Sequence, residues 1–236
     1  MGQIKQLIHK AFAGRSLSSR LADMPVSEVF KTIYDQNTWK GKESISGTGS
    51  SLQQTAHITA KLPAIMNELN VSSLLDIPCG DFYWMRHVDF AAMAYIGADI
   101  VEDLIRQNKE HETDNKSFIH RDVMTGELPA VDVIFCRDCL VHFSEQHVWR
   151  ALQNIARCNA KFLITTTFTH RTNAKKIETG QWRPLNLQAA PFALPKPIQL
   201  IDEKCTQDDG AYPDKMLGIW TLESIRSAVN QPKAAA

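Results

Sequence analysis

The stretch Leu74–Asp81 reads LLDIPCGD, and it decides the fold that this sequence predicts. An apolar run ends at Asp76, a turn containing Pro78 and Gly80 follows, and Asp81 adds a second carboxylate. Because Gly80 has no side chain, the turn can approach a ligand closely there, while the carboxylates can meet amine or hydroxyl groups. The stretch therefore predicts a strand whose carboxyl end binds a nucleoside-bearing ligand, and the acidic pair favours a cationic one.

A further acidic residue, Asp99, ends the next apolar stretch, MAYIGA, at residues 93–98. It follows Asp76 by about 20 residues, the separation expected for one strand, helix and strand unit in nucleotide-binding sheets. At that position an acidic side chain accepts hydrogen bonds from ribose hydroxyls. Either carboxylate alone could be a solvated strand end, but their order on successive predicted strands favours one binding site.

With these motifs the chain resembles the class I S-adenosylmethionine-dependent methyltransferases over about residues 50 to 167. Residues 74–81 correspond to the glycine-loop motif of that family and residues 95–99 to its ribose-binding strand. Asp122 followed by Val123 matches the adenine contact, and residues 131–138 match the fourth strand. The resemblance implies S-adenosylmethionine as the cofactor and a Rossmann-like sheet of seven mostly parallel strands with helices on both faces.

The loop departs from the family pattern of acidic, any, Gly, any, Gly, because Pro78 replaces the first glycine and Phe82 stands where a third often falls. Proline donates no hydrogen bond, so the loop must reach the ligand through the three residues after it. We expect Asp81 to meet the cofactor ammonium. The complete set of expected cofactor-binding residues is Gly47, Gly49, Asp76, Cys79, Gly80, Asp81, Asp99, Ile100, Asp122, Val123 and Arg137.

A dinucleotide-dependent dehydrogenase is the nearest alternative, because it shares the architecture and the acidic ribose contact. It would need a GxGxxG loop so that a pyrophosphate can sit against the amino end of a helix. The sequence PCGDFYW has one glycine and places Asp81 where that anion would lie. Like charges disfavour the pyrophosphate, so the dehydrogenase is the weaker interpretation.

The segment CRDCLVHFS, residues 136–144, supplies the candidate catalytic residues at the end of the predicted fourth strand. If the methyl acceptor is a hydroxyl, a general base within hydrogen-bond reach is needed, and Asp138 and His142 are the candidates. Histidine has the more suitable unperturbed pKa, while Asp138 is better placed by sequence. Both could instead be structural, with Asp138 capping a turn and His142 satisfied by neighbouring groups.

Composition and charge describe an ordinary globular protein. The 236 residues are 44% hydrophobic and 22% charged, and Lys plus Arg equals Asp plus Glu at 26 each, so no net field favours nucleic acid or a membrane. No apolar run approaches the roughly 18 residues of a membrane span, and no secretory signal is evident, so we expect a cytoplasmic protein. The five cysteines predict neither a disulfide framework nor a metal site.

The amino-terminal 50 residues are predicted to form a helical cap and a polar loop. Apolar side chains at helical spacing predict one helix over 3–13 and another from Pro25 to about Asn37. Residues 38–51, TWKGKESISGTGSS, are too polar for a core element. We expect this segment, called the Ser/Gly loop below, to close over the cofactor carboxylate through Gly47 and Gly49, although a plain surface connection would have the same composition.

From residue 51 to 229 the pattern alternates strands and helices, which predicts a parallel sheet covered on both faces. Strands are expected over 72–77, 93–98, 116–120, 131–136, 161–168, 198–205 and 215–222, and helices over 52–69, 82–89, 101–111 and 145–158. Residues 169–197 are polar and rich in proline, so we expect a lid there, with Trp182 and Arg183 contacting substrate. Residues 230–236 are expected to be a flexible tail.

The sequence thus predicts a methyltransferase acting on a small-molecule acceptor, such as a hydroxyl of a sugar or polar metabolite. The neutral charge balance and the caps favour an enclosed pocket over an open polymer-binding groove. A protein methyltransferase with a peptide cleft, or a module that binds the cofactor without catalysis, is the alternative. The sequence does not indicate the oligomeric state.

Overall fold

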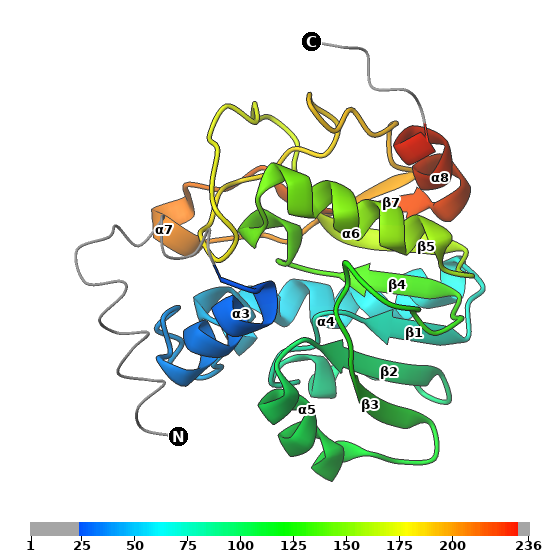
Figure 1. The fold of residues 1–236 in the computed structure, drawn as a ribbon. Helices are drawn as coiled ribbons and strands as arrows, with labels where there is room; N and C mark the ends of the chain where they lie inside the picture. Colours follow the sequence, from blue (N-terminus) through cyan, green and yellow to red (C-terminus); the bar gives the residue numbers. More distant parts are fainter. Residues whose placement is uncertain (1–23, 231–236) are drawn as a thin grey trace.

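The computed structural model describes residues 24–230, which form one central sheet with helices around it (Figure 1). The strand order is β3-β2-β1-β4-β5-β7-β6, and only β7 runs antiparallel to its neighbours. This confirms the predicted Rossmann-like fold of seven mostly parallel strands. The strand bounds are β1 Ser73–Asp76, β2 Ala94–Asp99, β3 Lys116–His120, β4 Val133–Cys136, β5 Phe162–Phe168, β6 Gln199–Asp202 and β7 Lys215–Thr221.

Two apolar cores lie on opposite faces of the sheet. Successive side chains along a strand point alternately into one core and the other. In β1, Leu74 belongs to one core and Leu75 to the other, and Val133 and Ile134 of β4 divide in the same way. The first core contains the apolar stripe of α4 (Leu52–Glu68). The second contains α6 (Glu145–Arg157) and α8 (Leu222–Asn230), whose helices pack against each other.

The observed helices follow local sequence signals at most positions. α3 spans Val26–Asp35 directly after Pro25, and α5 spans Glu102–Asn108. Ser144 caps α6, where its hydroxyl accepts a hydrogen bond from the backbone N–H of His147. The predicted helix over 3–13 lies outside the described residues. None of the helices within residues 24–230 is long and apolar enough to cross a bilayer.

The helix predicted over 82–89 is wrong. Only a short 3₁₀ turn, Met85–His87, forms there. Gly80 and Phe82 both have positive φ, at 55°, which a right-handed helix cannot accommodate. Phe82 takes this conformation because its ring is buried against Tyr95 of β2 and Phe118 of β3. The hydrophobic pattern in this segment therefore reflects a buried loop.

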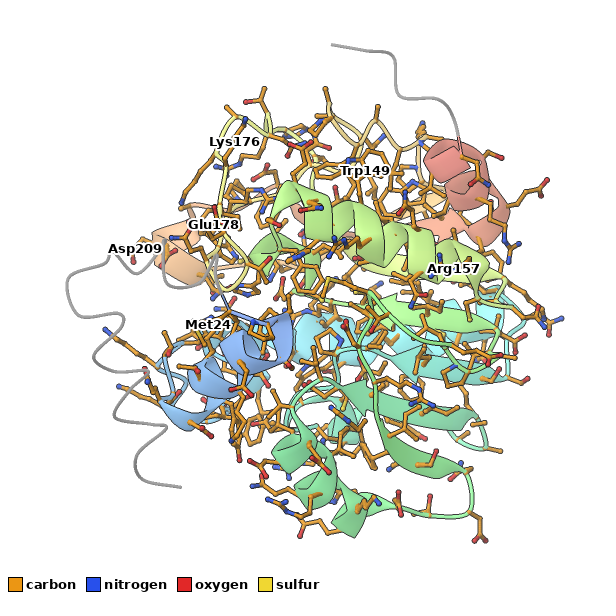
Figure 2. All side chains as sticks on the ribbon, in the orientation of Figure 1. Met24, Trp149, Arg157, Lys176, Glu178 and Asp209 are labelled. Carbon is orange, nitrogen blue, oxygen red and sulfur yellow. The ribbon has the colours of Figure 1, made fainter. Side chains whose placement is uncertain are left out.

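Three segments gather beyond one end of the sheet, where α3 and the small α7 (Gln207–Gly210) lie (Figure 1). The third is the segment 169–197, which contains no regular helix or strand. In Figure 2, Met24 before α3, Glu178 in that segment and Asp209 in α7 all lie at this end. These segments supply walls of the cavity described next.

Candidate active site

A cavity of about 330 Å³ opens at the carboxyl ends of the parallel strands. Asp76 ends β1, Asp99 ends β2, and Arg137 follows β4, so the sheet alone brings these three side chains to one edge. The sequence-predicted residues that line this cavity are Gly47, Gly49, Asp76, Cys79, Gly80, Asp81, Asp99, Ile100, Asp122, Val123, Arg137, Asp138, His142 and Trp182. The structure thus brings together residues from 47 to 182 that the sequence assigned to one site.

Asp76 is a buried carboxylate with one oxygen left for a ligand. Its Oδ2 accepts a 2.6 Å hydrogen bond from the Tyr95 hydroxyl, and within the described residues its Oδ1 has no hydrogen-bond partner. Burial raises the pKa of Asp76 to about 7, and the Tyr95 hydrogen bond offsets only part of that effect. A cationic ligand at Oδ1 would favour the ionised form.

Asp99 organises the glycine loop. Its Oδ2 accepts a hydrogen bond from the Gly80 N–H at 3.0 Å, and its Oδ1 accepts one from the Val101 N–H at 2.9 Å. Burial raises the pKa of Asp99 to about 6, while these backbone donors oppose the shift. Each oxygen retains a second lone pair, which is the acceptor capacity that ribose hydroxyls require.

Asp81 connects the glycine loop to the Ser/Gly loop. Its Oδ1 accepts hydrogen bonds from the hydroxyls of Ser44 and Ser46, at 2.8 and 3.3 Å, and its Oδ2 accepts from the Ile45 N–H at 2.9 Å. A methyl group built on Gly80 would lie 2.1 Å from the Ser46 hydroxyl oxygen, so the two loops are in contact. Asp81 lines the cavity, but its oxygens are largely committed to this loop, which leaves Asp76 as the freer carboxylate.

The predicted adenine side of the site is formed by backbone turns. Asp122 accepts hydrogen bonds from the Met124 N–H and the Thr125 hydroxyl, at 2.8 and 3.0 Å, which fixes the turn after β3. Val123 is buried and lines the cavity beside Ile100. An apolar side chain next to a fixed turn suits the face and edge of a flat base.

Four charged side chains form a buried cluster at the ends of β4, β6 and β7. Arg137 pairs with Glu203 at 2.7 Å, and Lys215 pairs with Asp138 at 2.7 Å. Arg137 also lies 3.4 Å from Asp138 and donates a 3.0 Å hydrogen bond to the Gly49 carbonyl. Burial alone would raise the pKa of Asp138, but Lys215 and Arg137 outweigh it and hold that pKa well below its usual range. Asp138 is therefore an ion-paired carboxylate and a poor proton acceptor.

His142 lines the cavity, and one of its ring nitrogens is held by the backbone. Its Nδ1 lies 3.0 Å from the Gln181 carbonyl oxygen, which can only accept, so Nδ1 carries the proton and Nε2 carries the lone pair. Within residues 24–230, Nε2 has no hydrogen-bond partner. Burial lowers the pKa of His142 to about 4, although Asp138 opposes this shift, so the ring is neutral near pH 7.

The structure corrects the role predicted for Arg183. It was expected to contact substrate, but it does not line the cavity, and its buried guanidinium donates a 2.6 Å hydrogen bond to the Phe143 carbonyl. Trp182, its neighbour, does line the cavity. Lining residues that sequence reasoning missed include Phe30, Tyr34, Trp39, Phe168, Tyr212 and Lys215. Only the Tyr34 and Phe30 positions had a sequence signal, and it indicated a helix stripe, not a pocket.

All five cysteines are buried free thiols, and two of them, Cys79 and Cys139, line the cavity. Within the described part of the chain, no group of three or more His, Cys, Asp or Glu side chains could hold a metal ion.

Comparison with known proteins points to one family. Residues 74–161 match the family described as methyltransferase domain, and this match spans the glycine loop, Asp99, Asp122 and Asp138. Among curated protein sequences, there is no significant match to the chain.

Solved structures show the same fold at low sequence identity. Human N-acetylserotonin methyltransferase in complex with SAM aligns with a TM-score of 0.57 and 11% identity, covering 93% of this chain and 67% of that one. Phosphoethanolamine N-methyltransferase 1 of Haemonchus contortus, in complex with phosphoethanolamine and S-adenosylhomocysteine, gives 0.57 and 13%, covering 93% and 55%. The methyltransferase domain of bacterial CtHen1-CN gives 0.53 and 10%, covering 72% and 100%.

Proposed function

We propose that this chain, a class I S-adenosylmethionine-dependent methyltransferase, transfers the methyl group to a hydroxyl of a small molecule, with His142 as the general base. The observation that carries the proposal is the unpartnered Nε2 of a neutral His142, in the same cavity as the buried carboxylates of Asp76 and Asp99. Two of the neighbours above are named for small molecules, N-acetylserotonin and phosphoethanolamine, which supports an acceptor of that size.

The residues present fit a cationic adenosyl cofactor. When bound, S-adenosylmethionine supplies a methyl group on a sulfonium, which leaves as a neutral thioether. Asp76 offers the free Oδ1 to an ammonium, and Asp99 offers lone pairs to ribose hydroxyls. Both carboxylates have raised pKa values because they are buried without a paired cation of their own, so a positively charged ligand supplies what the site lacks.

His142 is the better base of the two candidates. Asp138 is paired with Lys215 and Arg137, which hold its pKa well below its usual range, so it takes up a proton poorly. Among the described residues His142 Nε2 has no hydrogen-bond partner, and a pKa of about 4 is sufficient because a hydroxyl proton becomes strongly acidic as its oxygen gains a methyl group. The proton therefore passes to Nε2, while Asp138 and Lys215 hold the wall of the cavity around the reacting oxygen.

The test has two steps on the full chain. Calorimetry with S-adenosylmethionine and S-adenosylhomocysteine measures whether the cofactor binds. Incubation with methyl-labelled S-adenosylmethionine and a metabolite extract, followed by separation of small molecules from protein, then shows where label accumulates. We expect label in the small-molecule fraction as a methyl ether. Cofactor binding with label found only in protein would overturn the small-molecule proposal.

A further inference from the structure

Two groups of aromatic side chains line the cavity, and the part of its wall that they form is called the acceptor end below. The first contains Phe30, Trp39 and Phe143, with Phe30 ring centroids 6.3 Å from Trp39 and 5.8 Å from Phe143. It comes from α3, the Ser/Gly loop and the turn after β4.

The second group contains Phe168, Trp182 and Tyr212, whose rings meet edge to face with centroids 5.1 to 6.1 Å apart. It comes from the end of β5, the segment 169–197 and the chain after α7. The six side chains come from separate segments of the chain, yet all of them border the same cavity.

The candidate base lies at the edge of the first aromatic group. The His142 ring centroid is 4.7 Å from that of Trp39, and the two planes are inclined by 32°. Because Nδ1 is held by the Gln181 carbonyl, this contact fixes the ring in one orientation. A hydroxyl that reaches Nε2 therefore belongs to a molecule whose body lies against aromatic side chains.

Several polar side chains of the cavity wall are already engaged with protein groups. Lys215 is committed to Asp138, and the Gln207 amide donates a 3.0 Å hydrogen bond to the Thr48 hydroxyl. The Tyr34 hydroxyl already accepts a 2.9 Å hydrogen bond from Gln107. A sugar with several hydroxyls would lose water at each of them and regain few partners, at a cost of about 1–3 kcal/mol for each group left unpaired.

A quaternary ammonium acceptor also fits poorly. Aromatic cages bind such cations through the faces of their rings, but the Tyr212 ring already has the Arg171 guanidinium 5.4 Å from its centroid. Arg137 and Lys215 add two cations to the cavity wall, and their charge is balanced within the cluster by Asp138 and Glu203. Among the described residues, Glu203 Oε1 is a buried oxygen of that cluster without a hydrogen-bond partner, but Glu203 does not line the cavity and so cannot meet a cationic acceptor there.

We infer that the acceptor is a planar aromatic ring carrying one hydroxyl. The ring lies against the first and the second aromatic group, which contain Trp39 and Trp182, and its hydroxyl lies at His142 Nε2. This inference rests on the proposed function and narrows its small-molecule hydroxyl to a hydroxyl on an aromatic ring. It replaces the sugar that was expected from sequence. In the step, the acceptor oxygen forms a bond to the methyl carbon as the bond from carbon to sulfur breaks. The electron pair of that bond stays on sulfur, and the hydroxyl proton moves to Nε2.

The experiment uses 2-naphthol as the aromatic probe and methyl α-D-glucopyranoside as the sugar probe, with the full chain saturated with S-adenosylhomocysteine. Binding of each probe is measured by ligand-observed nuclear magnetic resonance. We expect 2-naphthol to bind and the glucoside not to bind detectably. Trp182→Leu should weaken 2-naphthol binding by about three- to tenfold, the worth of one aromatic contact.

Controls separate the inference from the function on which it rests. Tyr83→Leu removes an aromatic ring outside the cavity and should leave 2-naphthol binding unchanged. Trp182→Phe should restore most of the affinity lost in Trp182→Leu, and S-adenosylhomocysteine affinity should be equal in all variants. Tighter binding of the glucoside, or equal 2-naphthol affinity in Trp182→Leu and Tyr83→Leu, would overturn the inference while the methyltransferase function stands. Absence of S-adenosylhomocysteine binding would instead count against the proposed function.

Discussion

Asp76 shows how one residue can trade stability for binding. Its buried carboxyl has a pKa of about 7, above the ordinary value of 3.8, because burial disfavours the charge. A raised pKa in the folded state adds stability that is fully present below the unfolded pKa and is lost as pH rises through about 7. At neutral and alkaline pH the charge on this buried carboxylate therefore destabilises the folded protein without cofactor.

We predict that Asp76→Asn stabilises the cofactor-free protein near pH 8. The amide can still accept the Tyr95 hydroxyl hydrogen bond, and it carries no buried charge. The gain in the free energy of unfolding has an upper limit of about 4 kcal/mol and should shrink towards about pH 4. Urea titrations of both proteins across this pH range measure it. A variant less stable than the native protein near pH 8 would contradict the assignment.

His142 yields a kinetic prediction. His142→Asn should lower kcat by about 10²- to 10⁴-fold, the range for a lost general base, while cofactor affinity stays the same. The pKa of about 4 means that the native rate should not fall between about pH 8 and pH 5 through protonation of this ring. His147→Asn is the control, because its Nδ1 contacts the Thr179 hydroxyl and it does not line the cavity. An equal loss of kcat in both variants would contradict the assignment of His142 as the general base.

At this scale, the sequence could predict residues whose position follows from the chain direction alone. Asp76 and Asp99 end consecutive parallel strands, so their convergence needs only the strand pattern. Lys215 could not be predicted, because it reaches Asp138 from a strand that enters the sheet antiparallel, 77 residues away in sequence. Arg183 follows a tryptophan in a polar segment, and nothing in that pattern distinguishes a buried guanidinium from an exposed one.

The Ser/Gly loop is the element that connects α3 to the proposed cofactor site. Asp81 accepts hydrogen bonds from its residues 44–46, and Arg137 donates to the Gly49 carbonyl. Gly47 has a φ of 98°, a conformation that other residues rarely adopt, and a side chain there would meet Trp39 at 3.2 Å. The loop shape therefore depends on that glycine.

Gly47→Ala should weaken S-adenosylmethionine binding by about tenfold, because the strain of an alanine at this φ distorts the loop at the cavity wall and about 1.4 kcal/mol is enough for that loss. Gly126→Ala is a matched control, because Gly126 also has positive φ, at 76°, but lies outside this cavity with nothing within 4 Å of the added carbon. Calorimetry on both variants separates backbone strain from cofactor contact. Equal affinity in the two variants would reject the role of the loop.

Strand β7 is the second element with a consequence for the site. Because it runs antiparallel between β5 and β6, its first residue, Lys215, lies at the edge where the parallel strands end. Lys215→Met would leave Asp138 and Glu203 with one cation between them, and we expect a loss of about 3 kcal/mol in the free energy of unfolding. Lys161→Met, which removes the exposed partner of the half-buried Asp132, should cost less, about 1 kcal/mol, because Asp132 keeps its hydrogen bonds from Ser72 and Ser73. Similar losses in both would show that the buried pair has no special weight.

Helices and strands could be predicted where the spacing of apolar residues matches the side chains that are buried. The prediction failed where apolar side chains are buried without being part of a helix. The helix expected over 145–158 forms as α6, and its apolar residues Val148, Leu152 and Ile155 are fully buried. The segment after Gly80 has equally apolar residues, but the Phe82 ring packs on Tyr95 of β2 and Phe118 of β3 while its backbone has positive φ, so a helix is not possible there. α8 was not predicted, because its apolar residues follow directly on those of β7.

For the whole molecule, cofactor binding, protonation and stability are linked through the two buried acids. Asp76 and Asp99 have pKa values of about 7 and 6 before a ligand binds, both raised by burial. A cation next to them favours the ionised forms, so binding releases protons whenever the acids begin protonated. The cofactor should therefore bind more weakly as pH falls below about 7, by up to tenfold per pH unit for each acid.

Thermal unfolding at a fixed concentration of S-adenosylmethionine tests this linkage on the intact chain. A ligand at about 100 times its Kd stabilises the folded state by about 2.7 kcal/mol, and each kcal/mol shifts Tm by about 2–4 °C in a protein of this size. The Tm increase should therefore be about 5–10 °C near pH 8 and clearly smaller near pH 6. Asp76→Asn should show a smaller increase near pH 8 and a weaker pH dependence, since it has one titrating acid fewer. A Tm increase that grew towards acid pH would mean that the ligand does not lie beside Asp76 and Asp99. A cation beside these carboxylates favours their ionised forms, so it binds more weakly where they are protonated.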